Sequence, residues 1–295
     1  MSAAARQRPP AGTLFLDHVS HFVAQLDATA QVLDALGFTL TPPSAQRTQD
    51  GPAGTANICV MLEEGYLEFL APTGDTQGAA RLRAALRRYP GVHLACFGTS
   101  AATEEQARLG RHGFDPLPLV QLERPVAAAA TAQTARFSVV RVPPGKMPEA
   151  RVQFVEHLTP QWLWQPHLVD HANSASKLAC VFVVAQDPAE TAARWAHFAA
   201  ILPRPAGAYV HLATARGHVL IANAADWSVL LGDAPPAPAL AGYALQCRDP
   251  AALAARCQAA GFALRRLRRD LYAVQLPAAL GGAWVFGTRA SLAFH

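Results

Sequence analysis

The sequence predicts an α+β fold assembled from one repeated unit, which is a strand, a helix and about three further strands. The same pattern of an apolar strand followed by an amphipathic stretch recurs four times along the chain. The chain has 295 residues, a length typical of two domains of roughly 150 residues each. It is 51% hydrophobic and 16% charged, so it can bury a large core.

The first unit opens with LDHVSHFVAQLDATAQVLDALGF at residues 16–38. This stretch predicts a strand, a helix with Asp27 as its N-cap, and a Gly-Phe pair that leads into the next strand. The runs NICVML (57–62) and YLEFLAP (66–72) predict two further strands around a Glu-Glu-Gly turn.

The second unit opens with GVHLACFGTSAATEEQARLGRHGF at residues 91–114. Aligning the two openings places His93 opposite His18 and the second Gly-Phe pair opposite the first. Strands are expected at RFSVVRV (136–142) and RVQFVEH (151–157).

The third and fourth units begin at residues 178–198 and 240–262, and the third looks shortened. In both, an Asp-Pro pair marks the helix start, because Asp is a good N-cap and Pro suits the first helical position. Further strands are expected at YVHLAT, HVLIAN, DLYAVQL and AWVFGT.

Two units side by side predict an eight-stranded open sheet that curls around a cleft. The expected domains are residues 12–160 and 174–295. The aromatic and proline-rich bridge between them suggests an ordered connector. Its segment from Trp162 to Asn173 has two interpretations, a clamp between the domains or a lid over a cleft.

Charge and cysteine content limit the partners. The net charge is +4, and the densest arginine cluster (residues 265–269) indicates a solvated strand or turn instead of a nucleic-acid stripe. No apolar run is long enough to span a bilayer, and the start lacks a signal core. The cysteines are odd in number and lie mostly in apolar runs, which favours buried thiols in a cytoplasmic protein. They are Cys59, Cys96, Cys180, Cys247 and Cys257.

The stretches LDHVSHFV, CVMLEEGYLEFLAPTGD, GVHLACFGT, RFSVVRVPPG and QFVEHLTPQWLWQP resemble the vicinal oxygen chelate superfamily, specifically proteins with a glyoxalase-like domain. The resemblance covers the first half of the chain. It implies paired βαβββ modules that form a cup around a divalent metal, with ligands on the first and last strand of each module. The superfamily includes glyoxalases, epimerases, extradiol dioxygenases and metal-free resistance proteins, so the reaction stays open.

Carried over by residue, the resemblance implies His18, Glu68, His93 and Gln153 as metal ligands. Two imidazoles and a carboxylate suit Zn, Ni, Mn, Co or Fe. Glu68 also stands alone in an apolar strand, where a buried charge needs a partner. Glu156 is an alternative ligand to Gln153, although it would need a bulge to reach the same face.

Two further expectations follow. His21 faces away from His18 and is expected to be structural. In the second half the positions equivalent to the two histidines are assigned to Leu178 and Leu240, and the closing strands carry no acidic residue. That half is therefore expected to lack a metal and to have a structural or substrate-covering role.

The favoured function is a metal-dependent lyase or isomerase of glyoxalase type, acting on a small substrate with adjacent oxygens. The metal would act as a Lewis acid, and Glu68 could serve as general base. An extradiol-type dioxygenase and a metal-free binding module are the alternatives. The expected partner is a small molecule, without nucleic acid or membrane, and homodimer formation is left open.

Overall fold

The computed structural model describes residues 4–48, 51–128 and 131–293, and its first eight strands form a closed sheet, here called the barrel. The strands are β1 (Phe15–Phe22), β2 (Ser44–Thr48), β3 (Gly51–Met61), β4 (Tyr66–Pro72), β5 (Gly91–Gly98), β6 (Val120–Ala128), β7 (Thr131–Arg141) and β8 (Arg151–His157). Their order around the barrel is β1-β4-β3-β2-β6-β7-β8-β5.

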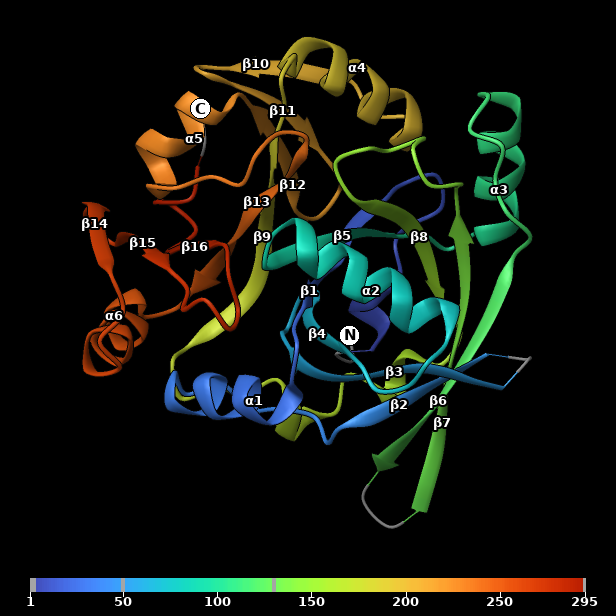
Figure 1. The fold of residues 1–295 in the computed structure, drawn as a ribbon, viewed down its shortest axis with the longest axis horizontal. Coiled ribbons are helices and arrows are strands. Elements are labelled where there is room, and N and C mark those ends of the chain that lie inside the picture. The colour runs from blue at the N-terminus through green and yellow to red at the C-terminus, as the bar shows by residue number, and fades with distance from the viewer. Residues whose placement is uncertain (1–3, 49–50, 129–130, 294–295) are drawn as a thin grey trace.

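The remaining strands form a second sheet of eight strands that does not close, here called the open sheet (Figure 1). In spatial order they are β10 (Pro203–Ala206), β11 (Tyr209–Ala213), β12 (His218–Ala222), β9 (Ala175–Val184), β13 (Ala239–Cys247), β16 (Ala283–Gly287), β15 (Leu271–Gln275) and β14 (Leu264–Arg268). The helices are α1 (Leu26–Ala35), α2 (Gln77–Arg88), α3 (Ala102–Arg111), α4 (Pro188–Ala199), α5 (Ala224–Leu231) and α6 (Pro250–Ala259), with short 3-10 turns η1 (Ala5–Gln7), η2 (Pro160–Trp162) and η3 (Pro166–Leu168).

The predicted α+β class and the four βαβββ modules are confirmed. In every module the first strand pairs in parallel with the last, as β1 does with β4 and β9 with β12. The sequence did not indicate helices α2 and α5, which connect the modules within each half. The strand expected after the first Gly-Phe pair is β2, whereas the sequence did not indicate β6 or β10.

The prediction of an open sheet is wrong for the first half, where the sheet closes. Long strands explain the difference, because β3 and β7 each have 11 residues and bring β2 and β6 into contact, with Arg47 opposite Glu123. In the second half β10 has 4 residues and β14 has 5, and both remain edges. Strand β14 carries the arginine cluster, and charge on an edge discourages pairing with another chain.

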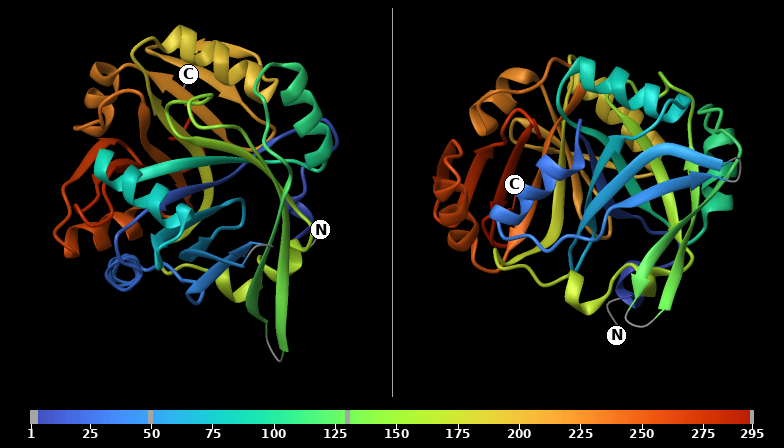
Figure 2. Two further views of the ribbon diagram at one scale, coloured as in Figure 1. Left: turned by 45° about the vertical axis from the view of Figure 1, so that its right-hand side comes forward. Right: turned by 60° about the horizontal axis from the view of Figure 1, so that its bottom comes forward.

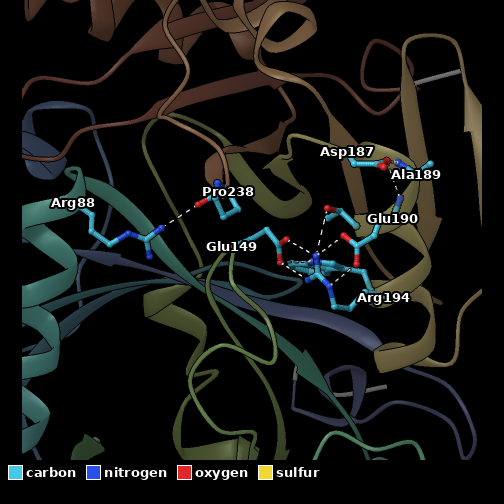
Figure 3. A network of polar contacts seen from close by, with 9 residues as sticks. Arg88, Glu149, Asp187, Ala189, Glu190, Arg194 and Pro238 are labelled. Carbon is cyan, nitrogen blue, oxygen red and sulfur yellow. Dashed lines mark hydrogen bonds and ion pairs between the residues drawn. The ribbon is translucent and has the colours of Figure 1, made fainter.

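Helix starts follow the predicted chemistry in the second half only. The Asp187 side chain accepts hydrogen bonds from the backbone N–H groups of Ala189 and Glu190 at the start of α4 (Figure 3). Asp249 caps α6 in the same way. Asp27 is not an N-cap, because α1 begins one residue earlier and Gln25 occupies the cap position without a side-chain bond.

Both ends of the barrel are covered. Helix α2 lies across one end and buries Leu82 in the cluster that fills the interior (Figure 1). The bridge segment covers the other end, where Trp164 donates from Nε1 to the carbonyl of Leu62 at 3.0 Å. His171 and Asn173 of this bridge bond to backbone carbonyls of Met61 and Leu36. All of these partners belong to the first half of the chain, so the contacts anchor the bridge to the barrel, and both interpretations of the bridge stay predictions.

The barrel packs directly against the open sheet, as the two views of Figure 2 show. His21 lies at this contact, stacked on Phe69, with its Nε2 donating to the carbonyl of Gly281. Burial lowers the pKa of His21 to about 3, so the ring is neutral. His21 is therefore structural, as predicted.

The five cysteines are buried and free, as the sequence indicated. Among the helices that the structure describes, none has the length and apolar character to cross a bilayer.

Replacing Asp187 by Ala removes two hydrogen bonds at the start of α4 and is expected to lower the free energy of unfolding by about 1 kcal/mol. Asp27→Ala is the matched control, since no capping bond is lost there, and its effect should stay within about 0.5 kcal/mol. Urea unfolding of the two variants measures both values. Equal destabilisation would contradict the assignment of the caps.

Candidate active site in the barrel

The barrel encloses a cavity of about 330 Å³, here called the inner chamber, and three of the four predicted site residues line it. His18 comes from β1, Glu68 from β4 and Gln153 from β8. His93 does not line this chamber. Gln153 contributes Oε1, a buried acceptor that has no hydrogen-bond partner among the described residues.

Glu68 is held by neutral donors from three strands. Its Oε2 accepts a hydrogen bond from the Ser20 hydroxyl, and its Oε1 accepts from the amides of Asn57 and Gln46. The residue is 8% exposed, so the carboxylate is buried yet reaches the chamber. These three donors are the hydrogen-bond partners that a buried Glu68 carboxylate requires and that the sequence alone did not identify.

His18 belongs to a buried network with Asp17 and His157. The Nδ1 atom of His18 donates to Asp17 at 2.8 Å, and Nε2 of His157 donates to the same carboxylate at 3.0 Å. Burial raises the pKa of Asp17, but His157 and His18 outweigh burial and lower it below its ordinary value. Burial lowers the pKa of His18, but Cys96 and Asp17 raise it well above its ordinary value.

His93 lies outside the chamber because the predicted alignment of the two histidines is wrong by one residue. The strand pairing places Ser20 beside Glu68 and Cys96 beside Gln153, so the residue equivalent to His18 is Leu94. A shift of one residue in a strand turns the side chain to the other face.

Two β-bulges show which residues of β1 and β5 correspond to each other in the two modules. Where β1 pairs with β5, the extra residues are Asp17 on one strand and His93 on the other. The sequence did carry the signal, because Gly113 follows Gly37 by 76 positions and the residue 76 positions after His18 is Leu94. The alignment paired His18 with His93, which are 75 positions apart, because both are histidines.

His93 has a packing role instead. Its ring stacks between Tyr89, with ring centroids 4.1 Å apart, and Phe22, at 5.1 Å. Its Nε2 donates to the Tyr89 carbonyl at 2.8 Å. Burial, together with the charge of Arg88, lowers the pKa of His93 to about 4.

Glu156 also lies away from the other predicted ligands. Its Oε2 accepts a hydrogen bond from the backbone N–H of Ala102 at the start of α3. Glu156 does not line the inner chamber, as expected for a strand residue three positions after Gln153.

In the open sheet, the positions equivalent to His18 and Leu94 are Cys180 and Gly242. The sequence assignment to Leu178 and Leu240 is therefore wrong, because bulges shift this register as well. Trp227 of α5 packs on the adjacent Phe182 with ring centroids 4.7 Å apart. Apolar packing therefore fills the face that carries the chamber in the barrel.

The inner chamber is rich in positive charge. Arg81, Arg124, Arg141 and Arg151 line it, while Glu68 is its only acidic lining residue among those described. Arg124 is 8% exposed and donates from Nη1 to Asn57 and to the sulfur of Cys59. Burial lowers the pKa of Arg124, but Cys59, Tyr66 and Glu68 raise it above its ordinary value, so it stays charged.

These residues do not fit a catalytic divalent ion. The chamber offers one imidazole, one carboxylate and one amide oxygen, and a leucine stands in place of the second imidazole. Within the described ranges, no group of three or more His, Cys, Asp or Glu side chains is placed to hold a metal. Four guanidinium groups around one carboxylate also repel a dication.

Comparison with known proteins supports the architecture. The family model described as a glyoxalase-like domain matches residues 16–199. A hypothetical protein from Staphylococcus aureus is similar in structure, with a TM-score of 0.66 and 12% identity, and covers 93% of this chain and 99% of its own. At such identity the likeness concerns the fold. No protein of curated function matches the sequence.

Two enzymes share the fold. The Mn(II)-bound glyoxalase from Novosphingobium aromaticivorans has a TM-score of 0.55 and 11% identity, over 94% of this chain and 82% of its own. A mutant of 4-hydroxymandelate synthase from Streptomyces coelicolor has a TM-score of 0.52 and 13% identity, over 94% of each chain.

Introducing the missing imidazole should create a metal site. Leu94→His places a second ring in the lining of the chamber that His18 also lines, and this variant is expected to retain more Ni²⁺ or Zn²⁺ after dialysis than the wild type, up to about one equivalent. The untagged wild type should retain far less than one equivalent. Metal analysis of the purified proteins measures both.

Two controls accompany this test. Adding His18→Ala to the Leu94→His variant should abolish the gain, whereas adding His93→Ala should not. Stoichiometric metal in the wild type that is lost in His18→Ala would show that the native donor set suffices.

The low pKa of His93 makes stability depend on pH. Above about pH 6.5 the ring is neutral in the folded and unfolded states. Between about pH 6.5 and 4 the unfolded chain binds a proton that the folded protein does not, so the free energy of unfolding falls as the pH falls. The loss approaches about 3 kcal/mol.

Denaturant unfolding at several pH values, compared between wild type and His93→Gln, isolates this contribution. The variant should lose less stability than the wild type over that range. Parallel curves would contradict a neutral, buried His93.

Proposed function

Because the chain belongs to the glyoxalase-like family of the vicinal oxygen chelate superfamily, we propose that its inner chamber is the active site of a lyase or isomerase. The reaction is a proton transfer on a small substrate with adjacent oxygen atoms. A chamber of about 330 Å³ suits such a molecule.

The observation that carries this proposal is the placement of Glu68. The chamber is lined both by a buried carboxylate that three neutral donors position and by His18, whose pKa is raised well above its ordinary value, and these are the parts of a general acid–base pair. Oε1 accepts two of these hydrogen bonds and Oε2 only one, so Oε2 has a free lone pair for the proton.

The proposed step moves one proton and one electron pair. Glu68 takes the proton from the substrate carbon next to a carbonyl, and the electron pair of the broken C–H bond moves onto the carbonyl oxygen. The imidazolium of His18 and the guanidinium of Arg124 lie in the same chamber and stabilise this oxygen as it gains charge. Asp17 keeps His18 protonated and oriented.

The reaction can finish in two ways. In an isomerase, Glu68 returns the proton to the former carbonyl carbon, and the hydroxyl on the deprotonated carbon passes its proton to the oxygen that gained charge, so that the hydroxyl carbon becomes the carbonyl. In a lyase, the electron pair on that oxygen re-forms the carbonyl, the bond to a leaving group on the carbon beyond the deprotonated one breaks, and Glu68 gives its proton to the leaving group. No metal enters this scheme, because the chamber stabilises negative charge with side chains of the chain itself.

Deuterium exchange tests the proposal without knowledge of the natural substrate. Incubation in D₂O with a panel of 2-oxo acids, 2-hydroxy aldehydes and hemithioacetals should give deuterium incorporation at a carbon next to a carbonyl in at least one compound. Glu68→Gln should lower the exchange rate by roughly 10²-fold or more, because it removes the base while keeping the shape of the side chain. NMR follows the incorporation.

Glu156→Gln is the matched control. It makes the same chemical change on strand β8, at a residue that does not line the inner chamber, and should leave the exchange rate unaltered. Binding of panel members without any exchange would reject the enzyme and support a metal-free binding module.

A further inference from the structure

We propose that the ligand of this site is an organic oxyanion with an apolar substituent, and that Arg81, Arg141 and Arg151 bind its anionic group. The proposal rests on the proposed function for the location of the reacting carbon. It adds the class of the ligand and the residues that recognise it.

A second cavity of about 690 Å³, here called the outer chamber, adjoins the inner one. The two chambers have three lining residues in common, and all three are arginines: Arg81, Arg141 and Arg151. They come from α2, β7 and β8 and stand where the two chambers meet.

These three arginines have no ion-pair partner among the described residues, although other arginines of the chain are paired. Arg194 bonds to Glu149, Arg108 to Glu105 and Arg136 to Glu123. The Nε atom of Arg141 is a buried donor without a partner in the described structure.

The surroundings compensate the charge of the cluster only in part, through Glu68. Glu68 is the one acidic residue among the described lining of the two chambers, and its oxygens already accept from three donors. Burial and the charges of Arg141 and Arg81 lower the pKa of Arg151 to about 10. Three neighbouring guanidinium groups repel one another, and a bound oxyanion would relieve this repulsion through paired N–H···O bonds.

The outer chamber is mainly apolar and has anchored walls. Phe22, Val142, Pro143 and Met147 are among the residues that line it. An apolar substituent of the ligand would gain about 25 cal/mol for each Å² that these residues bury.

Two polar contacts hold these walls (Figure 3). Glu149 lies in the loop that lines the chamber and binds Arg194 of α4 through two bonds of 2.9 Å. Arg88 donates to the carbonyl of Pro238 at 3.0 Å, which joins α2 to the second half of the chain. The chamber is therefore preformed at the contact between the two halves.

Three related compounds test the proposal by calorimetry. The probe 3-phenylpropanoate has both the anion and the apolar group, 3-phenylpropanamide lacks the charge, and propanoate lacks the apolar group. We expect the probe to bind the wild type about tenfold or more tightly than either of the others. Equal binding of the amide, or no binding of the probe at millimolar concentration, would overturn the proposal.

Variants locate the binding group. Arg151→Gln and Arg81→Gln should each weaken binding of the probe by about tenfold or more. Arg81 is exposed on α2, so this variant keeps the test informative if Arg151→Gln does not fold. Arg136→Gln removes a paired surface arginine and should not change binding. Unaltered binding in Arg81→Gln and Arg151→Gln would place the anion elsewhere and reject the proposal.

Two further arms refine the result. Phenyl phosphate in place of the probe distinguishes a preference for phosphate from one for carboxylate, and selective binding of either over the amide supports the oxyanion. Glu68→Gln should bind the probe at least as tightly as the wild type, because it removes the one negative charge that the described lining places near the arginines, while losing deuterium exchange. Retained probe binding with no exchange in the wild type would reject the proposed reaction and leave this inference standing.

Discussion

The antiparallel pairing of β1 with β5 is the constraint on which the site depends. It joins the two modules of the barrel, and its two bulges set which side chains of each strand point inward. Because of these bulges, His18 and Ser20 share the interior with Glu68, while His93 is turned toward the outer chamber. A different register on either strand would exchange polar interior groups for core residues such as Val19.

Charge decides what the inner chamber can hold. Glu68 is one negative charge among four lining arginines, and Asp17 is bonded to two histidines, so the acidic groups offset the positive charge of the chamber only in part. A chamber with excess positive charge and unpaired donors favours an anion over a dication.

The second half of the chain supports the site without repeating it. Its open sheet has short edge strands, and Trp227 fills the face that could have formed a second chamber. It nevertheless supplies Pro238 to the outer chamber and Arg194 to the loop beside it. Under the proposed function, the first half would hold the ligand and the second half would position the walls of the outer chamber.

The sequence by itself determined the repeated modules, the capped helices at Asp187 and Asp249, and the placement of His18, Glu68 and Gln153 on the first and last strands of their modules. These features are local, since each depends on spacing within a few residues of chain. The register between β1 and β5, the closure of the barrel and the meeting of three distant arginines were decided only by the tertiary structure. The spacing of the Gly-Phe pairs was consistent with the true register, but only the pairing of β1 with β5 locates the bulges that set it. Side chains from α2, β7 and β8 become neighbours only once the strands are paired.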